Sequence, residues 1–544
     1  MESVKKERRM EVEKSYFVFH FDLIHQIKNS LKKGGFMKKA VSLFLMILAL
    51  FAFSSAQQKD SAKAPDQAAT STDEKVTNLK GEVDGINESY LATKSTVDKL
   101  AKIKISGYTQ FQIRAATNYK EATDTTINKA KPGTYLYPVG DFSGGKFGQG
   151  VGSVEQLRRA RLKVAYETDL TTAVLQLDCI PFTYSNAATT VTSATTYDTA
   201  TKKYTTTNTP SNAAYLTGGG VTIKDAYLRF TEPWLKSFSL MGGVFDRPFG
   251  FEIHYSSSNR ETPERSRTEQ TLFPGERDLG VALEMYPGEN MGFMQYINFK
   301  GGVFTGNGIN VETDNARDFM GRLGFSVPLK EIGLGIDGGA SGYFGKVTSW
   351  NDVADSFAVS SKTFVKATGN YDKTFDRKYY GGDLQLYYSL PVIGGLSLRG
   401  EAYTGRQPGY ASSTSSPSNN VLNPGSIYSR NFLGFYAWYV QNIDPIKSQL
   451  VVKYDSYDPN TDIKVADIDS AKIAGGVSIA DLMFNTIGLG WIYHWDENIK
   501  FMLYYDIVQP EKVTNAYAAK NASFYPYTLD MKANVLTFRI QYKF

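Results

Sequence analysis

Apolar and polar side chains alternate one by one through many short stretches between residues 104 and 544. In QLRRARLKVAY, residues 156–166, one face of an extended strand would carry the cations Arg159, Arg161 and Lys163. The interleaved face would be apolar and would consist of Ala160, Leu162, Val164 and Tyr166. Successive side chains of a strand point to opposite faces, so this alternation predicts strands with one apolar and one polar face.

The C-terminal stretch NVLTFRIQYKF repeats the alternation and ends on Phe544. Its apolar face holds Leu536, Phe538, Ile540, Tyr542 and Phe544, and its polar face holds Thr537, Arg539, Gln541 and Lys543. Strands of about ten residues with this period are typical of transmembrane β-barrels. A last strand that ends on phenylalanine resembles the signal that the outer-membrane barrel assembly machinery recognises, so we expect Phe544 to be read by that machinery.

Turn-forming residues divide this region into strands joined by alternating short and long connections. Seven short turns lie near residues 168–171, 232–236, 287–292, 328–332, 391–395, 442–446 and 496–498, and eight longer connections lie between them. The alternation predicts an all-β fold, a transmembrane antiparallel β-barrel of about 16 strands over residues 104–544, with both chain ends on the periplasmic side. A barrel of this size is wide enough to leave an aqueous channel.

A helical period precedes the barrel. Apolar or small residues recur at spacings of three and four over residues 73–102, at Val76, Leu79, Val83, Ile86, Tyr90, Thr93, Val97 and Leu100. This strict heptad ladder predicts a short periplasmic coiled-coil helix, and the alternative is an amphipathic helix that lies on another surface. The preceding residues 57–72 have the composition of a disordered linker.

The N-terminal part contains an export signal. From Met37, two lysines precede a run of apolar residues, and Ser54, Ser55 and Ala56 follow it. Residues 37–56 therefore form a secretory signal peptide, which implies export through the Sec pathway and a mature chain that starts near Gln57. We expect residues 1–36 to be a mis-annotated extension, the alternative being an unusually long start of the signal.

Overall charge excludes a simple polyelectrolyte role. The 544 residues carry a formal charge of +5 that comes from residues 1–56, since the remainder has 50 basic and 50 acidic residues. We therefore expect no nucleic-acid partner. The abundant aromatic residues, 35 Tyr and 33 Phe, fit girdles at the two membrane interfaces. The single cysteine, Cys179, allows no internal disulfide.

The barrel explains the cationic stripe of residues 156–166. A cation that faces lipid near the midplane would cost about 2–4 kcal/mol, so Arg159, Arg161 and Lys163 should face the lumen. Lumenal cations attract anions and repel cations. The alternative is that these charges only balance lumenal acids, for which Asp225, Glu284, Asp383 and Glu401 have the right parity.

Several motifs in the third long connection resemble the phosphate-selective porin O and P family. The strand end Gly243, Phe245, Pro248, Phe249, Gly250 matches its G-x-F-x-x-P-F-G motif, followed by a Ser-Arg step at residues 257–260 (with Asn259 inserted) and a Glu-Arg-Ser triplet at residues 264–266. Residues 275–281 approximate its next strand entry, and RRARLKV is similar to its second strand. The resemblance implies a trimeric sixteen-stranded porin with an inward third loop, in which Arg260, Arg265 and Arg247 are candidate constriction residues.

The predicted function is therefore an outer-membrane diffusion porin of a Gram-negative bacterium that is biased towards phosphate or other small anions. The full set of anion-binding or pore-lining candidates is Arg159, Arg161, Lys163, Arg229, Arg247, Arg260, Arg265 and Arg399. No catalytic residue, metal or cofactor is expected. A structural or adhesive barrel is the alternative, and an enzyme is disfavoured because His254 and His494 lack a surrounding catalytic constellation. The stretch Asp455–Asp462 could bind calcium, but a turn at Asp458-Pro459-Asn460 explains it better.

Overall fold

A computed structural model describes two parts of the chain. The described residues are 72–116, 140–144, 153–179, 183–184, 190–198, 203–211, 216–217, 220–310, 316–352, 354–358, 363–410, 413–415, 426–464, 477–514, 524, 527 and 534–544. The predicted extension (1–36), the signal peptide (37–56) and nearly all of the predicted linker lie outside them.

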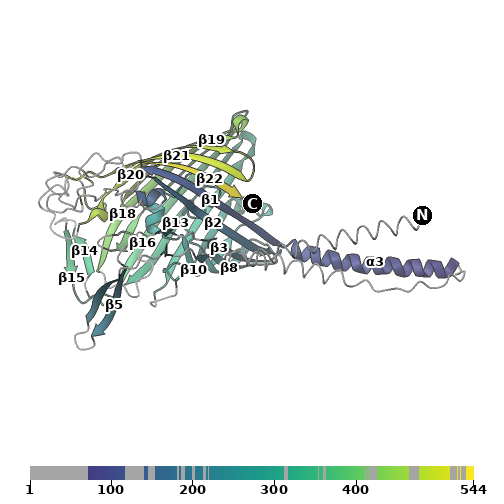
Figure 1. Ribbon diagram of the computed structural model, residues 1–544, viewed down its shortest axis with the longest axis horizontal. Coiled ribbons are helices and arrows are strands. Elements are labelled where there is room, and N and C mark those ends of the chain that lie inside the picture. The colour runs from purple at the N-terminus through teal and green to yellow at the C-terminus, as the bar shows by residue number, and fades with distance from the viewer. Residues whose placement is uncertain are drawn as a thin grey trace, which may run out of the picture. The chain divides into compact units, whose positions relative to one another are not determined.

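Sixteen antiparallel strands form a closed barrel, which confirms the predicted fold and strand number. Neighbours in sequence pair around the wall, and β1 pairs with β22 to close it (Figure 1). The strands are β1 (Ile103–Ala116), β2 (Ser153–Glu167), β3 (Thr171–Cys179), β8 (Val221–Thr231), β9 (Phe238–Asp246), β10 (Arg277–Met285), β11 (Ile297–Phe304), β12 (Asp318–Leu329), β13 (Leu334–Thr348), β16 (Thr374–Leu390), β17 (Gly394–Gly409), β18 (Ile427–Ile443), β19 (Ser448–Asp458), β20 (Phe484–His494), β21 (Ile499–Pro510) and β22 (Val535–Lys543).

The alternation in the sequence sets which way each strand faces. In β22, Phe538 is 36% exposed on the outer face, whereas Arg539 is 1% exposed on the inner face. In β2, Leu162 is exposed and Arg159 is buried. The barrel thus turns its apolar side chains outward and its polar side chains inward, as a membrane barrel requires.

The connections differ at the two ends of the barrel. Counted from β1 around the barrel, every second strand is followed by a short turn. Two of these turns contain the 3-10 helices η3 (Lys330–Ile332) and η5 (Asp444–Ile446). A third contains η2 (Glu289–Tyr296). The longer connections carry short additional pieces, namely η1 (Gly140–Ser143), β4 (Thr183–Tyr184), β5 (Thr190–Asp198), β6 (Lys203–Ser211), β7 (Leu216–Thr217), α4 (Arg267–Leu272), β14 (Ala354–Ala358), β15 (Thr363–Ala367) and η6 (Ile479–Asp481).

The first part of the chain is the helix α3 (Thr72–Leu100). Its heptad positions are solvent-exposed, with Val83 58% and Ile86 69% exposed. Among the described residues, no helix combines the length and apolarity needed to cross a bilayer. The coiled coil stays a prediction.

The barrel closes on a glycine. Gly107 of β1 exchanges two backbone hydrogen bonds of 3.0 Å with Phe544, the last residue of the chain. A Cβ on Gly107 would lie 2.6 Å from the Phe544 ring and 2.5 Å from the carbonyl oxygen of Arg161. The backbone of β2 cannot move away without loss of its pairing with β1, so this position requires glycine.

Replacing Gly107 by valine should therefore hinder closure of the barrel. We expect Gly107→Val to reduce the fraction of protein that shows the heat-modifiable gel mobility of a folded barrel. Gly382→Val is the matched control, because a Cβ there meets nothing nearer than 3.9 Å. Equal folded fractions for the two variants would contradict the role of Gly107.

Candidate functional site

The third loop, residues 247–276, connects β9 and β10 and contacts strands far around the barrel wall. Its Ser257 is hydrogen-bonded to Tyr108 of β1 (2.6 Å), and its Glu252 accepts a bond from Lys453 of β19 (2.6 Å). Further bonds reach β13, β17, β21 and β22. The loop therefore lies inside the barrel.

Local sequence explains the loop's shape. Gly250 adopts a positive φ of 59°, and a Cβ there would lie 2.7 Å from the Glu401 carboxylate, so the Pro248-Phe249-Gly250 bend needs glycine. Phe249 then packs beside Phe273 and Tyr403, with ring centroids at 5.0 and 5.5 Å. The Ser266 hydroxyl caps α4 by accepting the N–H of Glu269. An aromatic cluster thus fixes a loop that is otherwise rich in charge.

A single loop carboxylate binds three guanidinium groups. Glu264 Oε1 accepts from Arg158 Nε at 2.8 Å and from Arg539 Nη2 at 3.1 Å, and Glu264 Oε2 accepts from Arg159 Nη2 at 2.6 Å. Burial opposes ionisation of Glu264, but the three guanidinium groups outweigh it and hold its pKa well below the ordinary value. We call Arg158, Arg159 and Arg539 around Glu264 the Glu264 cage.

Two more cations lie beside the cage without a carboxylate partner among the described residues. Arg260 is 1% exposed, and its Nη2 donates to the Pro263 carbonyl that Arg539 also uses. Arg260 Nη1 has no hydrogen-bond partner in the part of the chain that the structure describes. Burial, with Arg265 and Arg159 nearby, lowers the pKa of Arg260 to about 9, so its charge is poorly compensated. Lys500 Nζ donates to the carbonyls of Ser258 and Arg260.

The rest of the cationic stripe in β2 differs along the strand. Arg161 is 2.8 Å from Asp178 of β3 and also donates to Tyr108 and Ser257. Lys163 is half-buried, and no acid in the described part of the chain lies within ion-pair distance of it. The stripe thus leads from a free cation at Lys163 to the Glu264 cage.

Other predicted site residues have structural partners. Arg265 bonds three carbonyls of its own loop and contacts Glu276, so it ties the two limbs of the loop together. Arg247 is fully buried against Asp278 (3.2 Å), and within the described ranges both of its terminal nitrogens lack a hydrogen-bond partner. Arg229 pairs with Glu284 at 2.8 Å.

Arg399 of β17 lies in an aromatic cage below the loop. Its guanidinium pairs with Glu261 of the loop at 3.1 Å. The guanidinium also lies 5.0 Å from the rings of both Tyr255 and Trp438. This packing fixes Arg399 and attaches the loop to β17.

Three of the four lumenal acids named from the sequence bind cations outside the stripe, and the fourth, Glu401, accepts the backbone N–H of Glu252 at 3.1 Å. Asp225 pairs with Arg277 at 2.8 Å, and Asp383 pairs with Arg322 at 2.6 Å. Glu284 is shared by Arg229 and Lys300. Because these acids are engaged elsewhere, the acid that meets the stripe is Glu264 of the loop, together with Asp178.

Sequence reasoning missed Arg158, Arg539, Lys500 and the role of Glu264. A β-bulge opposite Gln110 and Phe111 turns both Arg158 and Arg159 inward, which simple alternation cannot show. Arg539 is on the polar face of the last strand, but it is the single arginine of that strand, so no cationic pattern marked it as a site residue. The Asp455–Asp462 stretch holds a turn, in which Asp458 accepts the N–H of Asn460 at 3.0 Å.

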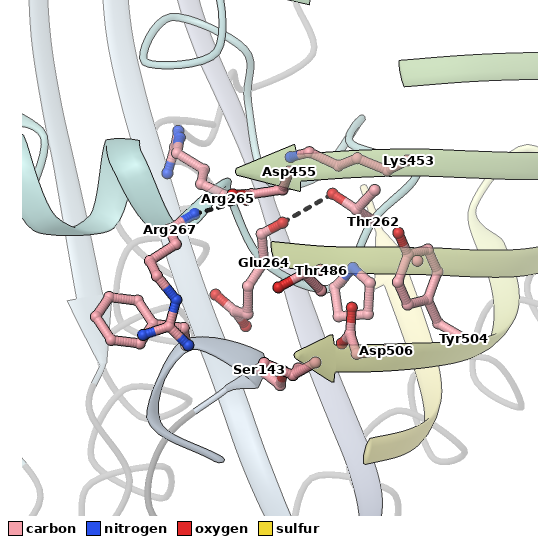
Figure 2. Close-up of a pocket in the computed structure, with 14 residues that line it drawn as sticks. Ser143, Thr262, Glu264, Arg265, Arg267, Lys453, Asp455, Thr486, Tyr504 and Asp506 are labelled. Carbon is pink, nitrogen blue, oxygen red and sulfur yellow. Dashed lines mark hydrogen bonds between the residues drawn. The ribbon is translucent and has the colours of Figure 1, made fainter. Parts of the chain in front are cut away.

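A small cavity borders the cage (Figure 2). It has room of about 30 Å³ for water-sized molecules and is lined by both charge signs, including Glu264, Arg265, Arg267, Lys453, Asp455 and Asp506. Arg267 donates its backbone N–H to Asp455 at 2.7 Å, and its guanidinium lies 3.9 Å from the rings of Phe142 and Phe484. This volume fits one or two waters, so the loop and the β19–β21 wall are nearly in contact here.

Two buried carboxyl groups share one tyrosine where α4 meets β17. The Tyr403 hydroxyl lies 2.5 Å from Glu269 Oε1 and also contacts Glu401. One hydroxyl proton cannot serve two ionised carboxylates, so one of them must be protonated. Burial, with the Glu252 carboxylate nearby, raises the pKa of Glu269 to about 8.

Docking of the loop on β17 should therefore depend on pH. Since docking raises the pKa of Glu269 above its free value, the contribution is complete below about pH 4.5 and is lost as the pH rises through about 8. We expect limited proteolysis of the third loop to accelerate roughly tenfold between pH 6 and pH 9. Glu269→Gln stays neutral and should flatten this dependence, whereas Glu261→Gln should keep it. An unchanged pH profile in Glu269→Gln would refute the assignment.

No family model and no curated protein matches the sequence. Among solved structures, the chain is similar to the outer membrane channel DcaP of Acinetobacter baumannii, at 10% identity over 81% of this chain and 97% of that chain, with a TM-score of 0.43. It is also similar to Pseudomonas putida OprB (10%, 83% and 96%, 0.45) and to an anion-selective porin from Comamonas acidovorans (10%, 81% and 99%, 0.40). Likeness at this level bears on neither solute nor selectivity.

Proposed function

We propose that this chain is an outer-membrane diffusion porin of a Gram-negative bacterium that passes small anions, such as phosphate, more readily than cations. One observation carries the proposal: where the third loop meets β2, β21 and β22, cations outnumber the carboxylates that pair with them. The single carboxylate of Glu264 is shared by Arg158, Arg159 and Arg539, and beside them Arg260 and Lys500 donate to loop carbonyls and have no ion-pair partner among the described residues. The nearby acids Glu252 and Glu261 are each paired with another cation, Lys453 and Arg399.

A surplus of positive charge at this position would attract anions that pass the loop and repel cations. Positive groups between low-dielectric walls focus the field and raise the local concentration of anions. Arginine suits oxyanions because its planar fork pairs two oxygens at once. Sixteen strands leave a lumen wide enough for water. The inward loop narrows this lumen, so ions pass close to the charges, where screening by salt is weaker.

The competing interpretation is that the lumenal cations only balance acids. Six of the eight candidate residues do have a carboxylate partner, and only Lys163 and Arg260 lack one in the described part of the chain. Under that interpretation the barrel would be structural or adhesive, with unspecific conductance or none. Ion selectivity distinguishes the two interpretations directly.

We propose, on its third-loop motifs, that the chain is a member of the phosphate-selective porin O and P family. Gly243 and Gly250 of the G-x-F-x-x-P-F-G strand end both adopt positive φ, at 128° and 59°, so the motif's glycines serve a conformation that other residues rarely adopt. The family implies a homotrimer. Assembly into the outer membrane would use the C-terminal Phe544.

Removing two cations of the stripe should weaken anion preference. In a planar bilayer under a salt gradient, we expect Arg159→Ala with Arg161→Ala to lower the anion-to-cation permeability ratio roughly two- to fivefold, because each lost charge acts on passing ions over a screening length of about 8 Å at physiological salt. The effect should shrink as salt rises. Lys366→Ala with Lys378→Ala removes the same charge at exposed positions and should leave the ratio unchanged. A cation-selective wild-type pore, or an unchanged ratio in the stripe variant, would favour charge balance.

The exposed heptad face of α3 should hold the trimer together. We expect native mass spectrometry of the wild type to show a trimer, and Val83→Asp with Ile86→Asp to dissociate at lower temperature because two charges enter the apolar seam. Thr77→Asp with Asn78→Asp adds the same charge off the seam and should not. A wild-type monomer or dimer would contradict the prediction.

A further inference from the structure

The Glu264 carboxylate has the surroundings of a bound oxyanion. Three guanidinium groups from two strands donate five hydrogen bonds of 2.6–3.4 Å to its two oxygens. We propose that Glu264 is a tethered anion that occupies the binding position of a divalent tetrahedral oxyanion, so that the loop itself competes with the solute and keeps its binding weak. This inference rests on the proposed anion-passing function and names the residue that sets affinity within it.

The donors exceed what one carboxylate can accept. Five donated bonds already saturate both oxygens of Glu264, since a carboxylate offers about four lone-pair positions. Two further donors nearby have no hydrogen-bond partner among the described residues: Arg260 Nη1 and Gln112 Nε2. Gln112 is fully buried, and its Oε1 accepts from Arg539 Nε at 2.9 Å. An anion with four oxygens would satisfy donors that a carboxylate leaves without partners.

The charges are unequal as well. The cage brings three positive charges to one negative charge, and Arg260 adds another close to Arg539 on the same Pro263 carbonyl (3.3 and 2.8 Å). Like charges this close are costly inside a protein unless an anion lies between them. A monovalent carboxylate offsets only part of that cost, whereas hydrogen phosphate or sulfate would offset more. The site therefore favours dianions over chloride.

The position is also open on one side. The Arg158 side chain is 32% exposed, whereas those of Arg159 and Arg539 are 7% and 2% exposed. Glu264 itself borders the small cavity next to the cage, opposite Asp455 and Asp506 (Figure 2). A solute would approach past Arg158 and would meet the tethered carboxylate already in place.

Competition by a tethered group has a use in a channel. Three arginines around a free position would retain a dianion, and conduction requires that a bound ion also leave. The loop carboxylate lowers the affinity of the cage and returns to it when the solute departs. Exchange of one negative group for another also keeps the arginines paired throughout.

The test removes the tethered charge and measures anion binding. Chloride current is recorded in planar bilayers at pH 7.4 while phosphate, or separately sulfate, is added. For Glu264→Gln we expect the concentration that half-blocks the current to fall at least about tenfold relative to wild type. Glu261→Gln, which removes the same charge from the same loop at the Arg399 pair, should change it less than about threefold.

The outcomes separate this inference from the proposed function. If the wild type is anion-selective but Glu264→Gln binds phosphate and sulfate no more tightly, the tethered-anion inference is wrong and the porin proposal stands. If the wild type does not conduct or prefers cations, the proposed function fails. Equal gains in Glu264→Gln and Glu261→Gln would show a general charge effect and would also overturn the inference.

A second variant tests the inference in the case that loss of the carboxylate displaces the loop. Glu264→Ala leaves the cage without any carboxylate, so the loop should become sensitive to protease. Added phosphate should restore resistance in Glu264→Ala at millimolar concentration and leave the wild type unaffected, whereas chloride at equal ionic strength should not. Protease sensitivity that phosphate does not reverse would refute the inference.

Discussion

The interior of this barrel depends on one arrangement of charge: a loop carboxylate held by guanidinium groups from two strands on either side of β1. Burying a charged loop is expensive unless its charges find partners of good geometry. Glu264 meets that requirement at one wall through Arg158, Arg159 and Arg539. Glu261 and Glu252 meet it at strands β17 and β19 through Arg399 and Lys453. The loop can therefore cross the lumen as a polar bridge and not as a hydrophobic plug.

Apolar packing holds one part of the loop in place, and ion pairs hold the other part. Near its roots, Phe249, Leu272 and Phe273 are buried in an aromatic cluster with wall tyrosines such as Tyr379. Farther from its roots, the loop contacts the wall mainly through hydrogen bonds and charges. The first part fixes position by shape, and the second part leaves donors and acceptors that an ion in transit can exchange.

The sequence predicted the barrel well because the membrane imposes a strict rule. Lipid on one side and water on the other force a period of two, and each strand repeats the rule independently, so strand number and turn positions follow from pattern alone. The site obeyed no such rule. Which acid meets Arg159 depends on a loop that returns across the barrel, and Glu264 is separated from Arg539 by 275 residues of the chain. Long-range partners of this kind leave no local pattern, although the richness of the loop in arginine did point to the right segment.

The bulge in β2 has a consequence for insertions and deletions. Leu157 pairs opposite Phe111 and Arg159 opposite Gln110, so Arg158 is the extra residue of the bulge and has no partner residue on β1. Loss of Arg158 would leave every other side chain of β2 on its present face. Loss of a neighbour outside the bulge would turn the rest of the strand inside out and carry its cations into lipid. The charge of the cage is thus adjustable by a single residue at this one position, while the surrounding strand tolerates no change in length.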